Sequence, residues 1–114
     1  MQIPKPSDAD KAYFRGLVPE GPGVDVKPMF GNLGAFVNGN MFMGLFGSDV
    51  GLRLAPEDAT DLLGPEGAGP FGPAERPMGG YVTLPAVMRG TPEVSAWVER
   101  AIGHVRAMPP KVPT

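Results

Sequence analysis

The sequence predicts a two-layer α+β fold, in which helices pack on one mostly antiparallel sheet with a central Asn-Gly hairpin. Three observations lead to this prediction. Asn38-Gly39 separates two apolar runs, an arrangement typical of a tight β-hairpin. Helix-start signals occur at Ser7, Pro56 and Thr91. Several strand-like segments follow the first helix directly, and one more lies between the second and third helices.

The first predicted helix begins after Ser7, whose hydroxyl suits an N-cap, and carries acidic residues in its first turn. Gly16 and Pro19 bound it, and residues 19–23 are expected to form a loop before a strand over 24–30. A short apolar stripe on this helix would consist of Ala9, Ala12, Tyr13 and Phe14.

The hairpin prediction depends on Asn38-Gly39, because a type I′ turn requires positive φ at both central residues. Its return strand, 41–46, is apolar on both faces. Such a strand is expected either to lie centrally in the sheet, covered twice, or to form part of an interface.

The second half of the chain begins with a short strand over 51–54 and a helix that opens at Pro56 and is closed by Gly64. Ten of the seventeen residues in 64–80 are Gly or Pro, which predicts an irregular connection with at most a brief bridge near Phe71. A strand is expected over 81–84.

The last predicted helix is the most regular element of the chain. Thr91 is expected to cap it, and Pro92 suits the first helical position. Pro109 and Pro110 end it. The residues expected on its apolar face are Val94, Trp97, Val98, Ala101, Ile102 and Val105.

Length and composition limit what the chain can be. Its 114 residues are expected to form one domain, 1–114, with a core at about 7–108. The absence of cysteine excludes disulfides and thiolate chemistry, and it favours a cytoplasmic location. No lysine lies between Pro28 and Pro110, so no basic patch for direct nucleic-acid binding is expected. No apolar run is long enough for a membrane span or a signal peptide.

The sequence offers no arrangement typical of a catalytic, cofactor or metal site. His104 is the only histidine, and the residues around Ser48 lack nucleophile-elbow spacing. Residues 67–72 match the letters G-x-G-x-x-G, but a predicted helix rather than a strand precedes them. We therefore predict no catalytic residue, no cofactor and no metal. Three acidic residues of the helix that opens at Pro56 are expected to lie on its solvated face: Glu57, Asp58 and Asp61.

A Met-Phe-Gly run at 29–31 leads into the Asn-Gly hairpin, and an aromatic strand and a tryptophan-bearing helix follow in order. This combination resembles the TfoX N-terminal domain family over roughly residues 8–107. The positions that carry the resemblance are Met29, Phe30, Gly31, Gly34, Asn38, Gly39, Phe42, Tyr81, Pro85 and Trp97.

The resemblance implies a two-layer domain with an antiparallel sheet and supplies no catalytic residues. In the best-known members, the competence regulators called TfoX or Sxy, this domain is joined to a C-terminal helical domain, and the full proteins act as transcriptional co-activators. We expect a stand-alone N-terminal domain without that second domain.

We therefore expect a non-catalytic regulatory or protein-interaction domain, with a transcription regulator or a second copy as its partner. One alternative is a small-ligand binder or minor enzyme that uses Glu75, Arg76 or Tyr81 beside the 64–80 connection. Another is a homodimeric structural module. The candidate protein-contact residues are Met41, Phe42, Met43 and Phe46.

Overall fold

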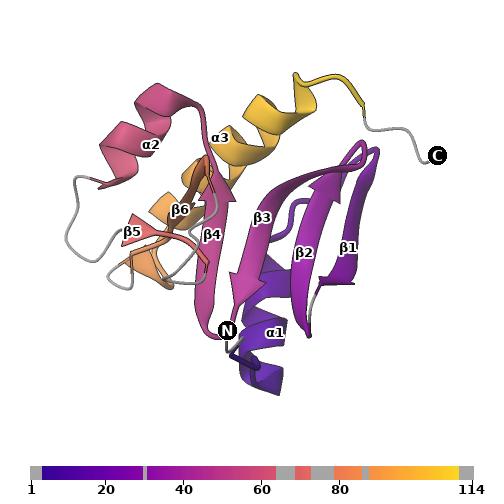
Figure 1. Ribbon diagram of the computed structural model, residues 1–114, viewed down its shortest axis with the longest axis vertical. Coiled ribbons are helices and arrows are strands. Elements are labelled where there is room, and N and C mark those ends of the chain that lie inside the picture. Colours follow the sequence, from indigo (N-terminus) through magenta and orange to yellow (C-terminus); the bar gives the residue numbers. More distant parts are fainter. Residues whose placement is uncertain (1–3, 30, 64–68, 73–78, 86–87, 111–114) are drawn as a thin grey trace.

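The computed structural model describes residues 4–29, 31–63, 69–72, 79–85 and 88–110. Within these ranges the chain forms three helices and six strands (Figure 1). In chain order they are α1 (Asp8–Leu17), β1 (Val24–Met29), β2 (Asn32–Val37), β3 (Asn40–Phe46), β4 (Asp49–Arg53), α2 (Pro56–Leu63), β5 (Gly69–Pro70), β6 (Tyr81–Thr83) and α3 (Glu93–Arg106).

The six strands form one sheet in the order β1-β2-β3-β4-β6-β5, and every neighbouring pair is antiparallel. The first four strands are a meander, because short turns connect them in sequence. β6 adds to the far side of β4, and β5 forms the outer edge. The predicted α+β fold is confirmed. The apolar return strand, β3, lies centrally in the sheet, as one of its two expected positions requires, but the described helices cover only one of its faces.

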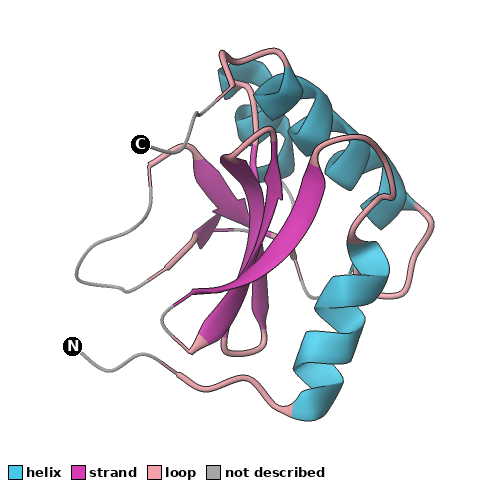
Figure 2. Cartoon of the chain, turned by 90° about the vertical axis from the view of Figure 1, so that its right-hand side faces the viewer, coloured by secondary structure: helices cyan, strands magenta, loops and turns pink. Residues whose placement is uncertain are grey.

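The helices cover one face of this sheet. α3 crosses β2, β3 and β4, while α1 packs against α3 and α2 packs beside β6. Figure 2 shows the sheet with α1 and α3 on one side of it. The opposite face carries no helix among the described residues. The two faces of the sheet therefore have different surroundings.

The main hydrophobic core lies between the sheet and α3. Alternate residues of each strand point to this side, because successive side chains in a strand project to opposite faces. The predicted apolar face of α3 supplies the other half of the core, although Trp97 is only partly buried. The core residues, each at most 5% exposed, include Phe14, Leu33, Ala35, Val37, Met43, Leu45, Val50, Leu52, Val82, Val94, Val98, Ala101, Ile102 and Val105.

The Asn-Gly turn forms as predicted, with φ of 53° at Asn38 and 83° at Gly39. The hairpin that it closes also contains an irregularity. Ala35 pairs with Met43 but Phe36 pairs with Met41, so Phe42 is an extra residue in β3. Because of this bulge, the Phe42 side chain points into the core, where it is fully buried.

The start of α1 is fixed by a capping box. The Ser7 hydroxyl accepts a hydrogen bond of 3.0 Å from the Asp10 N–H, and the Asp10 carboxylate accepts one of 2.9 Å from the Ser7 N–H. The bond from the Ser7 N–H to the carboxylate is the main cause that lowers the pKa of Asp10, and a side-chain hydrogen bond with Ser7 lowers it further. The predicted apolar stripe of α1 needs correction, because Ala9 and Ala12 are exposed. The buried stripe consists of Phe14 with the partly buried Tyr13 and Leu17.

The predicted cap of α3 also needs correction. The helix starts at Glu93, with Pro92 at the N-cap position and no side-chain capping bond. The Thr91 hydroxyl instead donates to the Met88 carbonyl at 2.6 Å. The predicted C-cap of α2, Gly64, lies outside the described residues. β5 confirms a brief pairing beside Phe71 within the connection that was expected to be irregular.

Asn32 is the only buried polar residue in the described part of the chain, at 4% exposure. Its side-chain N–H donates to the Pro4 carbonyl at 3.1 Å, and its side-chain oxygen accepts from the Gly47 N–H at 2.8 Å. These bonds offset the cost of burying an amide. Asn32 thereby ties the segment before α1 to the turn between β3 and β4.

Candidate functional site

The sheet face opposite α3, which we call the open face, has glycines at its centre. Gly34 pairs with Gly44, and Gly44 pairs with Gly51, so three neighbouring strands lack a side chain at the same level. Other side chains fill the space that results. The residues gathered on the open face are Met29, Phe36, Met41, Phe46, Phe71 and Tyr81.

Phe71 covers two of these glycines. A Cβ added at Gly51 would lie 2.2 Å from Phe71 Cγ, and one at Gly44 would lie 3.2 Å from Phe71 Cε2. Phe71 is 2% exposed. Its ring meets Phe46 edge-on at a centroid distance of 6.2 Å and meets Tyr81 at 6.1 Å. The glycines therefore form a seat for this ring, which holds the 69–72 segment against the sheet.

Tyr81 closes one side of the same cluster. Its hydroxyl donates to the Met41 carbonyl at 3.0 Å, and the Arg53 guanidinium lies 5.9 Å from its ring centre. Burial raises the pKa of Tyr81, and the charge of Arg53 opposes this rise. The phenol is consequently neutral near pH 7 and acts as a positioning group within the cluster.

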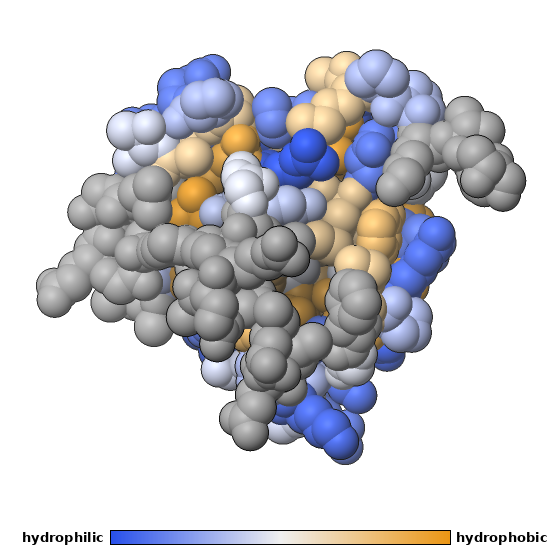
Figure 3. Space-filling model, viewed as in Figure 1, coloured by the Kyte–Doolittle hydropathy of each residue, from blue (hydrophilic) through white to orange (hydrophobic). Residues whose placement is uncertain are grey.

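The other side of the open face is more accessible. Met29, Phe36, Met41 and Phe46 are all partly exposed. The Lys27 ammonium lies 5.4 Å from the Phe36 ring centre. Figure 3 looks onto this face and shows apolar surface between polar side chains. The cluster is thus packed at Phe71 and partly open to solvent around it.

The structure divides the four predicted contact residues. Met41 and Phe46 are partly exposed on the open face, as a contact role requires. Phe42 and Met43 are fully buried in the core beneath α3. This placement corrects the contact set, because a fully buried side chain cannot meet a partner without local unfolding. The bulge at Phe42, which no local sequence signal indicates, explains the difference.

The residues that carry the family resemblance have structural roles where they are described. Gly31 has φ of 82° in the turn between β1 and β2, a conformation that favours glycine. A Cβ added at Gly34 would lie 2.9 Å from Met41 Sδ and 3.0 Å from a ring carbon of Phe36. Pro85 is fully buried. Phe30 lies outside the described residues.

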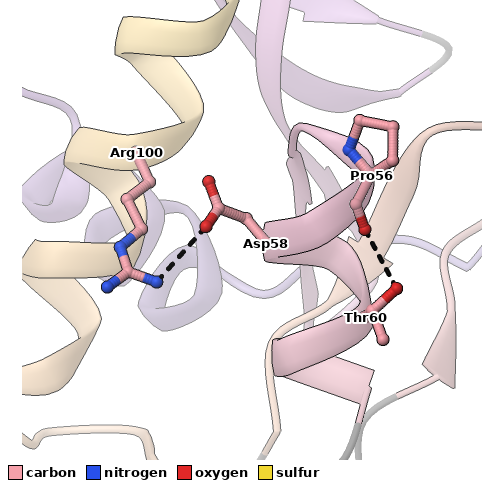
Figure 4. Close-up of polar contacts among 4 residues, drawn as sticks. All are labelled: Pro56, Asp58, Thr60 and Arg100. Carbon is pink, nitrogen blue, oxygen red and sulfur yellow. Dashed lines mark hydrogen bonds and ion pairs between the residues drawn. The ribbon is translucent and has the colours of Figure 1, made fainter.

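Polar contacts on the helices lie both between α2 and α3 and within each of these helices. The Asp58 carboxylate of α2 lies 3.4 Å from the Arg100 guanidinium of α3, while the Thr60 hydroxyl bonds the Pro56 carbonyl at 3.0 Å (Figure 4). Arg100 also lies 4.5 Å from the Trp97 ring centre. In the part of the chain that the structure describes, no group of three His, Asp or Glu residues could hold a metal ion.

A shallow depression of about 480 Å³ lies beside β1, a feature that the sequence did not predict. Sequence reasoning placed a ligand site beside 64–80 instead. Of the polar groups proposed there, Glu75 and Arg76 lie outside the described residues, so that alternative stays a prediction. The depression is lined by Arg15, Val18, Pro19, Glu20, Gly21, Val24, Asp25 and Val26.

No helix within the described ranges is both long and apolar enough to cross a membrane. A family model described as the TfoX N-terminal domain matches residues 16–105. No curated protein and no solved structure has a significant match to the chain.

Proposed function

Because the chain belongs to the TfoX N-terminal domain family, we propose that it is a non-catalytic regulatory domain that binds a protein partner through its open face. The observation that carries this proposal is the cluster of partly exposed methionine and aromatic side chains on the sheet face that no described helix covers. Such a cluster offers a partner apolar area that is already held in position.

The chemistry of the open face favours an apolar partner surface over a strongly charged one. Lys27 has Asp25 at 3.8 Å, so opposite charges stand together at one border. Arg53 lies over the Tyr81 ring at the other border. Binding through Met41 and Phe46 is therefore expected to depend weakly on salt, since buried apolar area rather than ion pairing supplies the affinity.

Two further parts of the proposal follow from the family. The competence regulators TfoX and Sxy contain this type of domain and act as transcriptional co-activators, so we place the partner among transcription regulators in the cytoplasm. The non-catalytic part rests on the same family resemblance, which supplies no catalytic residues.

Affinity capture with the tagged domain, in lysate of its natural host treated with nuclease, tests the proposal. Met41→Lys and Phe46→Asp place charges on the open face without entering the core. The amount of partner that each variant captures is expected to fall at least tenfold, while the circular dichroism spectrum stays that of the wild type.

Ala96→Lys is the matched control, because Ala96 is exposed on α3 and lies on the other side of the sheet. It is expected to retain the partner. If both open-face variants fold and capture the same proteins as the wild type, the proposed surface is wrong.

A further inference from the structure

β1 forms one edge of the sheet and is six residues long, whereas β5, at the opposite edge, has two residues. An edge strand presents unpaired backbone groups that can add a further strand. We infer that two copies of this chain join through their β1 strands, antiparallel and centred on Val26, to form one continuous sheet. This inference is independent of the function proposed for the open face.

The backbone of β1 presents its free groups at alternate residues. The Asn38 N–H donates to the Gly23 carbonyl at 3.1 Å, which makes this a hydrogen-bonded pair of the β1–β2 ladder. In an antiparallel ladder such pairs alternate, so Asp25 and Lys27 also direct their N–H and carbonyl groups toward β2. Val26, between them, directs both of its groups outward.

Only a pairing centred on Val26 can form two hydrogen bonds at its centre. The Val24 N–H is already bonded to the Gly21 carbonyl at 3.3 Å. Pro28 has no N–H to donate. A pairing centred on either of these residues would therefore lack central hydrogen bonds. In a pairing centred on Val26, the Val26 N–H of each copy donates to the Val26 carbonyl of the other copy. Among pairings centred on a residue whose backbone groups point outward, the free groups thus favour Val26.

The charges of β1 are self-complementary in this register. A two-fold axis at Val26 places Asp25 opposite Lys27 of the second copy, and Lys27 opposite Asp25 of the second copy. Both side chains are more than half exposed, at 61% and 57%, so they are available for contacts across the seam. Two opposite-charge pairs result, which favours this pairing over one that brings like charges together.

The depression beside β1 supplies complementary shape on the other side of the strand. Val24 and Val26 pack toward the core, and with Val18 they line this depression of about 480 Å³. The same two-fold axis places the exposed Pro28 of the second copy opposite Val24. Each copy's proline would therefore cover apolar surface in the depression of the other, as a symmetric interface requires.

Light scattering after size-exclusion chromatography tests the pairing. The wild type is expected near 24 kDa, about twice the 12.0 kDa of one chain, at sub-millimolar concentration and low salt. Asp25→Lys and Lys27→Asp each place like charges together twice, and each is expected to weaken association about tenfold. The double variant Asp25→Lys/Lys27→Asp restores opposite charges and is expected to recover the wild-type dissociation constant.

Val26→Pro provides a second test, because it removes an N–H that points away from β2 and so spares the chain's own ladder. It is expected to be monomeric with a wild-type circular dichroism spectrum. A wild-type mass that stays near 12 kDa would overturn the inference. Lys27 and Pro28 would then be residues that prevent the edge strand from pairing with another chain. A double charge variant as weak as the single variants would overturn this register.

Discussion

The two faces of the sheet are built from alternate residues of the same strands, yet they are packed in different ways. The covered face presents mainly valine, leucine and alanine to α3, together with Phe42 and Met43, and on β2, β3 and β4 these residues are buried almost completely. The open face presents three glycines and a group of methionine and aromatic side chains, of which only Phe71 is fully enclosed. The two faces of one sheet therefore differ in how fully they are packed, and the function proposed above uses the less packed face for recognition.

The difference has a physical cause in side-chain volume. Branched aliphatic residues fill the space between a sheet and a helix at high density. A row of glycines instead leaves room for a ring to lie directly on the backbone, as Phe71 does at Gly44 and Gly51. We therefore expect substitutions on the covered face to lower stability and substitutions at the border of the open face to affect binding.

The largest effect is expected from Phe42→Ala, which should lower the free energy of unfolding by about 3–5 kcal/mol, because a fully buried ring leaves a cavity. Phe36→Ala is the matched change on the open face, where the ring is partly exposed, and it is expected to cost about half as much or less. Urea denaturation followed by circular dichroism measures both. Equal losses would contradict the distinction between the faces.

A smaller loss of about 1–3 kcal/mol is expected from Gly51→Ala, because the new Cβ would lie 2.2 Å from Phe71 Cγ. Gly103→Ala is the control. Apart from the adjacent residues and the helix's own backbone, no atom lies within 4 Å of a Cβ at this exposed position of α3, and the change is expected to stabilise the helix by about 0.5–1 kcal/mol. Thermal and urea denaturation measure both variants.

The double variant Gly51→Ala/Phe71→Ala sharpens this prediction. Removal of the ring relieves the clash, so its loss of stability is expected to be smaller than the sum of the two single losses. Strictly additive losses would show that Phe71 does not depend on the absence of a side chain at Gly51.

The smallest effect is expected at the start of α1, on the covered side. Ser7→Ala should lower the free energy of unfolding by about 1 kcal/mol near pH 7, because it removes one bond of the capping box. Ser95→Ala, at an exposed position of α3, should change it by less than about 0.5 kcal/mol.

The other half of the capping box, the Asp10 carboxylate, gives a pH-dependent measurement. The pKa of Asp10 in the folded chain lies below its ordinary value of 3.8, so the stabilisation is present above that value and is lost as pH falls through the folded pKa. The difference between the wild type and Asp10→Ala, which removes the carboxylate, is therefore expected to shrink in urea denaturation near pH 2. An unchanged difference there would exclude Asp10 as the source.

The elements with local signals were predictable from the sequence. The pair Asn38-Gly39 favours a tight turn with positive φ at both residues, and Ser7 with Asp10 forms a cap from residues three apart. The apolar face of α3 follows from its periodicity. Each of these features depends on neighbouring residues, so one sequence suffices to find it.

The open face depends on contacts between distant residues and was only partly predictable. Phe71 meets Gly51 twenty positions away in the chain, and nothing near either residue indicates the other. The direction of Phe42 depends on the bulge opposite Ala35 and Phe36, which shifts a pattern of alternation that otherwise holds. Met41 and Phe46 were identified by composition alone, which cannot tell an exposed methionine from a buried one.

Trp97 gives the molecule an internal optical probe. It is the only tryptophan of the chain, and it lies partly buried on α3 with the Arg100 guanidinium above its ring. Its emission will change when α3 leaves the sheet. The partner proposed for the open face would lie on the opposite side of the sheet from the indole, so a titration followed at tryptophan wavelengths would report unfolding and not that binding.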